Sequence, residues 1–233
     1  MPRIPKTPLL HCFDPENNIE IGLDESGRGP MFGRLYVAAV ILPKDETSGF
    51  DHTAMRDSKT IKSRKVMAKI ADHIKTHAIA YHIHYIDADV IDEINILQAN
   101  MKAMHACVRE ILKKCPPHTI SGTLIVVDGN YFKPYTIYDP DASEFKCYRS
   151  ETIVKGDGKY SSIAAASILA KDARDSHIES MCDVYPQLDE RYGMRTNFGY
   201  GTKKHMDGIR EHGITQFHRR TFGLCKESTI TEL

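Results

Sequence analysis

Several acidic residues stand where their carboxylates could gather around a metal ion. Asp24 and Glu25 end the apolar run IEIGLDE, Asp128 follows the apolar run GTLIVV, and a later helical segment offers Asp172 and Asp175. Carboxylates packed together repel one another and raise each other's pKa unless a cation compensates them. Oxygen ligands without thiolates or imidazoles favour Mg²⁺ or Mn²⁺. Two such ions suit phosphodiester hydrolysis, because one generates the attacking hydroxide and the other stabilises the leaving oxygen.

Each of the later acids also has an ordinary interpretation. Asp128 opens the tripeptide DGN, a common turn signal. Asp175 stands four residues after Lys171, the spacing of a surface ion pair on a helix. Taken singly, both acids are better explained by these structural roles. Only their occurrence together with the Asp-Glu pair favours a shared metal site.

A glycine-rich loop follows the Asp-Glu pair directly. The stretch IGLDESGRGPMFG, positions 21–33, holds four glycines around a single arginine, Arg28. Glycine has no Cβ, so its backbone can approach a ligand closely. A tight turn between two strands would explain the glycines but not the acids before them. The stretch therefore predicts a ligand-contacting loop beside the carboxylates.

The elements that must position these residues alternate between strands and helices. Hydrophobic periodicity predicts strands at 19–25, 34–42, 78–86 and 122–130, and helices at 57–77, 87–114 and 161–181. Strands interleaved with long helices indicate an α/β domain with a mixed sheet. We expect an irregular lead-in at 1–18, a catalytic domain at 19–182 and a helical C-terminal region at 183–233 packed on that core.

Charge is balanced overall but not locally. The 233 residues include 31 basic and 31 acidic side chains, which gives no global attraction to nucleic acid or to a membrane. Positions 55–75 and 195–226 each carry seven Lys or Arg against two acids. These segments either converge on one polyanion-binding face or form two solvated helix faces, and charge alone favours neither.

The spacing of the cysteines and the hydropathy of the sequence indicate the cellular compartment. The six cysteines show neither a CxxC pair nor zinc-type spacing. The sequence contains no signal peptide and no long apolar run. Reduced thiols in the cytoplasm, with no membrane association, are therefore expected.

Seven sequence blocks match one protein family in that family's own order. They are DESGRGPMFG, DSK, IDEINILQANMKAM, VDGN, KGDGKYSSIAAASILAKDARD, GYGT and HRRTF. On these blocks the chain resembles type 2 ribonuclease H, also called ribonuclease HII, from about position 20 to about position 222.

The resemblance implies an RNase H-like fold, a mixed central β-sheet flanked by helices, with a small C-terminal helical extension that helps to hold substrate. It implies an endonuclease that hydrolyses the RNA strand of RNA/DNA hybrids. Cleavage on the 5′ side of a ribonucleotide embedded in duplex DNA, giving 3′-hydroxyl and 5′-phosphate ends, is also implied. Nucleic acid is then the partner, two Mg²⁺ or Mn²⁺ ions are the cofactors, and we expect a monomer.

Carried over by position, the resemblance assigns four metal-binding and catalytic acids, Asp24, Glu25, Asp128 and Asp175. Asp172 replaces a small apolar residue of the family pattern and is an alternative ligand. We prefer Asp175 because it ends the AKDARD match.

The resemblance also assigns the substrate contacts. Gly27, Arg28 and Gly29 match the loop that reads the ribose 2′-hydroxyl through main-chain groups. That hydroxyl distinguishes RNA from DNA, and only a backbone free of Cβ atoms can come close enough to bind it. Tyr200 matches the tyrosine that stacks on the next sugar. Lys59, in the DSK block, is either a phosphate ligand or an ordinary exposed lysine.

Other positions depart from the family pattern. Ser26 replaces a common alanine, Met31-Phe32 replace smaller apolar residues, and Asn197-Phe198 stand where His-Lys commonly precede Gly-Tyr. The last departure bears on the placement of Tyr200 and so on junction preference.

Two other functions are considered. A recombinase- or integrase-like nuclease of the same fold would use an acidic cluster, but it needs no Gly-Arg-Gly reader and would cut all-DNA duplexes. A non-catalytic hybrid-binding subunit predicts damaged acids, whereas all four are present.

Overall fold

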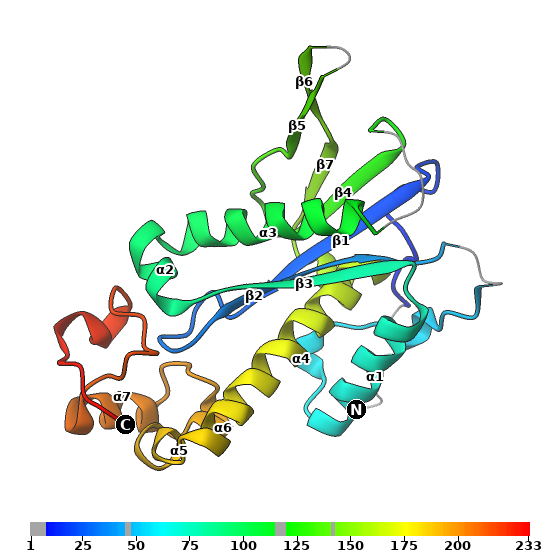
Figure 1. The fold of residues 1–233 in the computed structure, drawn as a ribbon. Coiled ribbons are helices and arrows are strands. Elements are labelled where there is room, and N and C mark those ends of the chain that lie inside the picture. Colours follow the sequence, from blue (N-terminus) through cyan, green and yellow to red (C-terminus); the bar gives the residue numbers. More distant parts are fainter. Residues whose placement is uncertain (1–7, 45–47, 115–119, 141–142) are drawn as a thin grey trace.

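A five-stranded mixed β-sheet forms the centre of the protein. In the computed structural model, which describes residues 8–44, 48–114, 120–140 and 143–233, the strand order is β3-β2-β1-β4-β7 (Figure 1). The strands are β1 (Ile19–Ser26), β2 (Leu35–Ile41), β3 (Ala80–Ile86), β4 (Thr123–Asp128) and β7 (Arg149–Ile153). β1 and β3 run antiparallel to β2, and β4 runs parallel to β1 and β7. The predicted mixed sheet is confirmed.

Helices cover both faces of this sheet. α3 (Ile96–Leu112) lies on one face, and α1 (Arg64–His77) and α4 (Ser161–Val184) lie on the other (Figure 1). The helix predicted at 57–77 begins only at Arg64. Ser63 caps it by accepting a hydrogen bond from the Val66 N–H, and Ser58–Thr60 form a separate 3-10 turn.

Side-chain alternation along β1 directs neighbouring residues to opposite faces. Ile21 and Leu23 are fully buried in the cluster formed with α3. Gly22 faces α4, where an added Cβ would lie 2.3 Å from the carbonyl carbon of Ser162. Glycine is therefore what lets α4 lie so close to β1, and Asp24, two residues on, emerges on the same side.

The single helix predicted at 87–114 is wrong, because the chain breaks at Asn95. α2 (Ala88–Ile94) ends there and α3 begins at Ile96. Asn95 adopts a left-handed φ of 65°, and its side chain accepts hydrogen bonds from the N–H groups of Leu97 and Gln98. A cap with a short polar side chain thus interrupts an apolar periodicity that runs through both helices.

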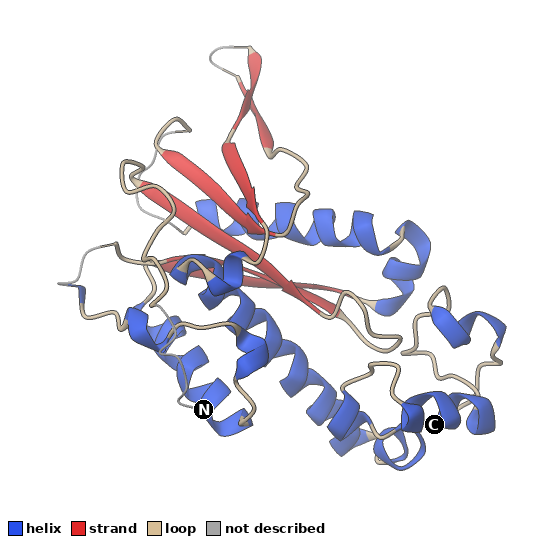
Figure 2. Cartoon of the chain, turned by 180° about the vertical axis from the view of Figure 1, so that it is seen from behind, coloured by secondary structure: helices blue, strands red, loops and turns tan. Residues whose placement is uncertain are grey.

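Three strands between β4 and α4 are not predicted by hydrophobic periodicity. β5 (Thr136–Asp139) and β6 (Glu144–Cys147) form a hairpin that projects beyond the sheet (Figure 2), and β7 closes the sheet next to β4. β7 reads RSETI and only its last residue is buried. Its polar sequence hides an edge strand from hydrophobic periodicity.

The C-terminal region packs around the loop between β1 and β2. Its helices are α5 (Gln187–Tyr192), α6 (Met194–Asn197) and α7 (Lys203–His212). Phe32 is fully buried in the apolar cluster that these helices form with the end of α4. The main chain joins as well, since the Met31 N–H donates to the Gly199 carbonyl and the Gly33 N–H to that of Phe217. The large apolar pair Met31-Phe32 thus anchors this region to the sheet.

Three remaining expectations concern the chain as a whole. The boundary expected after residue 182 falls within α4, which continues to Val184. No helix in the described segments is long and apolar enough to span a membrane. Five cysteines are free thiols, and Cys115 lies outside the described residues.

Candidate active site

Three of the four predicted acids meet at one edge of the sheet. Leu23 of β1 pairs with Val127 of the parallel strand β4, so Asp24 and Asp128 lie side by side where these strands end. Together with Glu25 they line a cavity of about 190 Å³. Residues 104 positions apart in sequence thus share one site, because the carboxyl ends of adjacent parallel strands meet at the same edge.

Burial and mutual repulsion shift the protonation of Asp24 and Glu25. Burial raises the pKa of Asp24 well above its usual range, and the neighbouring carboxylates of Glu25 and Asp128 raise it further. Burial also raises the pKa of Glu25, where the Arg28 cation opposes the shift and Asp128 adds to it. The Arg28 guanidinium lies 3.7 Å from the Glu25 carboxylate. The charged forms of Asp24 and Glu25 are therefore disfavoured, although Arg28, Lys59 and Lys171 also line the cavity.

The fourth predicted acid, Asp175, does not join these three in the lining of the cavity. Its side chain comes from α4 and is buried, and its Oδ2 accepts a hydrogen bond of 2.9 Å from the Lys171 ammonium. Lys171, rather than Asp175, lines the cavity. The i,i+4 ion pair anticipated on this helix does form, but at the edge of the acidic site instead of on an open surface.

The donor set fits a divalent cation by its chemistry. Within the described residues, no three His, Cys, Asp or Glu side chains are already arranged to hold a metal ion. The carboxylates instead accept protein hydrogen bonds of 2.7 Å, Asp24 from the Glu25 N–H and Asp128 from the Gly156 N–H. The buried Oδ1 of Asp175 has no hydrogen-bond partner. This oxygen lies 3.9 Å from the Arg174 guanidinium, too far for a hydrogen bond. A buried oxygen without a hydrogen bond and a set of crowded carboxylates suit Mg²⁺ or Mn²⁺.

The glycine-rich loop borders the same cavity, which Gly27, Arg28 and Gly29 all line. Gly27 has a φ of +95°, and an added Cβ would lie 2.3 Å from Nε of the buried Arg174. Glycine is thus required at this position for two reasons: its positive φ, and the lack of space for a Cβ atom. At Gly29 the nearest atom to an added Cβ is Cε1 of Tyr200, at 4.0 Å. Gly29 therefore keeps its surface open toward the cavity.

Tyr200 completes the rim of the cavity from the C-terminal region. Its side chain is half exposed and lines the cavity, and its ring lies 5.7 Å from the guanidinium carbon of Arg174. The preceding Asn197 bonds the Tyr192 carbonyl and the Gly199 N–H with its side chain. Phe198 adopts a left-handed φ of 49° and offers its carbonyl to Arg174. The two departures from the family pattern thus form the support beneath Tyr200.

Lys59 also lines the cavity, and most of its side chain is exposed. Its ammonium lies 3.5 Å from Oδ2 of Asp157. Asp157 belongs to the KGDGK segment and is buried. Burial and then the Asp128 carboxylate raise the pKa of Asp157. Lys59 is therefore at the right place for a phosphate ligand but is already attracted to a carboxylate.

Sequence relatives decide the family to which this site belongs. A family model described as Ribonuclease HII matches residues 21–225. The chain belongs to the ribonuclease HII family. A relative from Cytophaga hutchinsonii named Ribonuclease HII is 43% identical over 215 residues, which cover 91% of this chain and 93% of that protein. The chain is accordingly a ribonuclease H, an endonuclease that hydrolyses phosphodiester bonds.

Solved structures share the fold. The ribonuclease H2 from Pyrococcus horikoshii OT3 superposes with a TM-score of 0.63 at 21% identity and covers 90% of this chain and 96% of that one. Bst-RNase HIII in complex with Mn²⁺ gives a TM-score of 0.65 at 20% identity and covers 90% of this chain and 68% of that one. The predicted RNase H-like fold is confirmed.

Asp172, the alternative metal ligand, forms ion pairs with two cations on α1. Its carboxylate lies 3.2 Å from the Arg64 guanidinium and 3.7 Å from the Lys75 ammonium, both on α1. Arg64 also pairs with Glu179 at 3.1 Å. Asp172 therefore helps to fasten α1 to α4, and two cations of the first basic segment are engaged within the protein.

Sequence patterns missed two buried arginines next to the site. Arg174 and Arg219 are 1% and 0% exposed, although arginine is ordinarily a surface residue. Arg174 underlies Gly27, and Arg219 bonds several carbonyls of the glycine loop. Both lie inside blocks shared with ribonuclease HII, AKDARD and HRRTF. No pattern distinguishes the buried Arg219 from the exposed Arg220 beside it.

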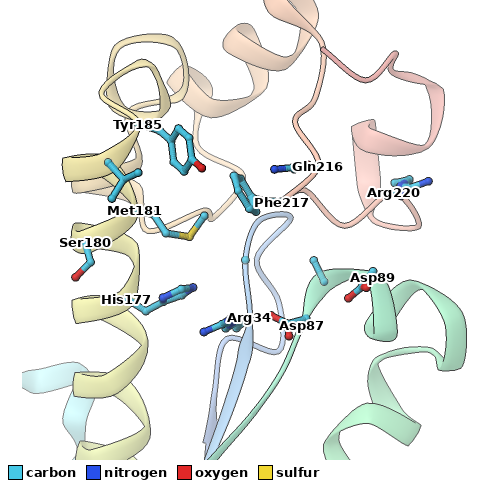
Figure 3. Close-up of a pocket in the computed structure, with 13 residues that line it drawn as sticks. Arg34, Asp87, Asp89, His177, Ser180, Met181, Tyr185, Gln216, Phe217 and Arg220 are labelled. Carbon is cyan, nitrogen blue, oxygen red and sulfur yellow. Dashed lines mark hydrogen bonds and ion pairs between the residues drawn. The ribbon is translucent and has the colours of Figure 1, made fainter. Parts of the chain in front are cut away.

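A larger cavity of about 670 Å³ lies at the far end of the glycine loop, between α4, the start of β2 and the C-terminal region (Figure 3). Arg34 and Asp87 lie next to each other on one side of it, and Arg34 Nε donates to Asp87 Oδ1 at 2.6 Å. Met181 and Phe217 supply an apolar wall. None of the four predicted acids lines this cavity.

Proposed function

We propose that this ribonuclease H cleaves on the 5′ side of ribonucleotides embedded in duplex DNA, as well as within the RNA strand of hybrids, by two-metal-ion catalysis. The observation that carries the proposal is the position of the Gly27–Gly29 loop on the same small cavity as Asp24, Glu25 and Asp128. A reader of the 2′-hydroxyl must lie within one nucleotide of the scissile phosphate, because the hydroxyl and the 5′-phosphate that is cut belong to the same nucleotide. The products would carry 3′-hydroxyl and 5′-phosphate ends.

The four acids are the proposed metal ligands. Mg²⁺ or Mn²⁺, when bound, would supply the attacking hydroxide and stabilise the leaving oxygen. The orphaned Oδ1 of Asp175 and the raised pKa of Asp24 support a cationic occupant. The Mn²⁺ complex of Bst-RNase HIII is consistent with this choice of ion. Lys171 would have to yield part of its hold on Asp175 when the ions bind.

Main-chain N–H groups are the proposed readers of the ribose. Within the described part of the chain, the N–H groups of Arg28 and Gly29 donate no hydrogen bond to the protein. Both residues line the cavity, so their amides are free for a 2′-hydroxyl oxygen. Tyr200, half exposed opposite Gly29, would stack on the next sugar, and Lys59 would contact a phosphate.

Residues 183–233 are the proposed substrate-binding wall of a catalytic domain that spans 19–182. Tyr200 is the residue of this region that lines the cavity. We place the enzyme in the cytoplasm as a monomer, with the free thiols Cys12, Cys107, Cys147, Cys182 and Cys225 as the supporting observation.

The decisive experiment compares two substrates that differ by one oxygen atom. A DNA duplex with a single ribonucleotide should be nicked on its 5′ side in Mg²⁺ or Mn²⁺, and the all-DNA duplex should stay intact. Equal cutting of both duplexes would support a recombinase-like nuclease instead, and no cutting of either by pure protein would support a binding subunit. Tyr200→Ala should slow cleavage at the single ribonucleotide more than cleavage of a long hybrid.

A further inference from the structure

The side chain of Arg219 is inserted among the main-chain carbonyls of the glycine loop. Nε donates to the Gly33 carbonyl at 2.9 Å, Nη1 to those of Pro30 and Arg28 at 2.9 and 3.2 Å, and Nη2 to that of Gly27 at 2.6 Å. All three guanidinium nitrogens are used, and Arg219 is 0% exposed. One side chain thus fixes four peptide groups of the loop.

These carbonyls take the place of a carboxylate partner for Arg219. In the described segments Arg219 has no ion pair, and the adjacent Arg174 is a second cation. A buried charge is unfavourable unless hydrogen bonds compensate it. Asp92, the nearest influential acid, accepts instead from the N–H groups of Arg220 and Thr221 at 2.7 and 2.9 Å, which secures the turn that carries Arg219.

The direction of the carbonyls determines the direction of the amides. In a trans peptide the C=O of one residue and the N–H of the next lie in one plane and point in opposite directions. Every peptide bond in the described chain is trans. When Arg219 holds the Gly27 carbonyl, the N–H of Arg28 points away from it. The same holds for the Arg28 carbonyl and the N–H of Gly29. These are the two amides without a protein acceptor beside the cavity.

We infer that Arg219 is a specificity-determining positioning residue, which holds the carbonyls of the glycine loop inward so that the Arg28 and Gly29 amides face the ribose. The inference rests on the proposed function, since it assumes that these amides read the 2′-hydroxyl. Arg219 touches neither substrate nor metal ligands; it acts through the loop. Lysine cannot replace it, because a single ammonium cannot reach carbonyls that diverge around a planar guanidinium.

The test measures discrimination in a cleavage-deficient Asp24→Asn background. Affinity for a labelled duplex with one ribonucleotide is divided by affinity for the same all-DNA duplex. Adding Arg219→Lys should lower this ratio at least about tenfold, roughly the effect of losing one or two hydrogen bonds. Arg220→Lys, an equal change at the exposed neighbour, should leave the ratio unchanged. In the native background, Mn²⁺ affinity measured by calorimetry should not change with Arg219→Lys.

Two further arms keep the outcome clear. If Arg219→Lys does not fold, Asp92→Ala loosens the same turn from the surface and should lower the ratio in the same direction. An unchanged ratio in a folded Arg219→Lys protein, or in Asp92→Ala where that variant is used, overturns the inference. If the Asp24→Asn parent binds both duplexes equally while native enzyme still cuts only at the ribonucleotide, the inference about Arg219 fails and the proposed function stands. If native enzyme does not discriminate either, the proposed function fails.

Discussion

At the scale of single residues, Asp24 is a buried side chain whose charged form is unfavourable. Burial and two neighbouring carboxylates raise its pKa. Asp24→Asn removes that repulsion and keeps the oxygen that accepts from the Glu25 N–H. We expect kcat to fall roughly a hundredfold or more. Without divalent ions the variant should be more stable than the native protein, because the buried charge and its repulsion are removed, measured by thermal and denaturant unfolding.

The matched control is Asp172→Asn on α4. It removes a carboxylate that pairs with Arg64 and Lys75, away from the cavity. Stability should fall while kcat stays unchanged. A loss of activity in Asp172→Asn with none in Asp24→Asn would show that the metal site lies at Asp172 on α4 and not at Asp24 on β1.

Substitutions at two glycines of the loop should have different effects, on stability at Gly27 and on cleavage at Gly29. Gly27→Ala introduces a Cβ at a φ of +95° and 2.3 Å from Arg174, so it should destabilise the protein by roughly 1–3 kcal/mol. Gly29→Ala meets no atom closer than 4.0 Å and should leave stability within about 0.5 kcal/mol. It should nevertheless slow cleavage, because its methyl group lies where the sugar must approach. Equal stability losses in the two variants would contradict this division.

At the scale of elements, two buried histidines connect α7 to the turn that follows it. The Thr215 N–H donates to Nδ1 of His218 at 3.0 Å, which places the His218 proton on Nε2. His218 Nε2 then donates to His205 Nε2 at 3.1 Å, and His205 Nδ1 donates to the Tyr200 carbonyl at 3.0 Å. The chain of bonds requires both rings to be neutral.

This histidine chain predicts acid sensitivity. Burial, and then His205, lower the pKa of His218 to about 3, against about 6.5 in an unfolded chain. Between these values the unfolded state binds a proton that the folded state does not, so stability falls as pH falls below about 6.5. We expect a loss of roughly 2 kcal/mol between pH 7 and pH 5, measured by urea unfolding. His218→Gln should reduce this slope, and an identical slope in the variant would refute the assignment.

Elements were predictable from the sequence where one physical signal dominates. β1, β2 and β4 are buried apolar runs, and the acids at the ends of β1 and β4 indicated the site because parallel strands share an edge. β7 was missed because its exposed side chains carry no apolar pattern. The break at Asn95 depends on a cap whose φ of 65° no periodicity reveals. The burial of Arg219 depends on residues nearly two hundred positions away, which only the fold brings together.

At the scale of the whole molecule, Phe32 joins the sheet to the C-terminal region. It is fully buried, and its ring packs edge-on against Phe217 and His218. Phe32→Ala should destabilise the protein by roughly 3–5 kcal/mol. Hydrogen exchange should show faster opening in 183–233 than in β1. Phe145→Ala, at an exposed position of the β5–β6 hairpin, is the control and should change neither measurement.

The contact between Arg219 and Gly27 spans 192 positions of the chain, so the order of synthesis matters. A nascent polypeptide emerges from its N-terminus and folds as it emerges. The strands that bear Asp24 and Asp128 leave the ribosome long before the arginine that orders the loop between β1 and β2. On the proposed roles, an incomplete translation product would hold the hydrolytic acids but no formed ribose reader. The loop between β1 and β2 can therefore take its final form only after Arg219 has been made.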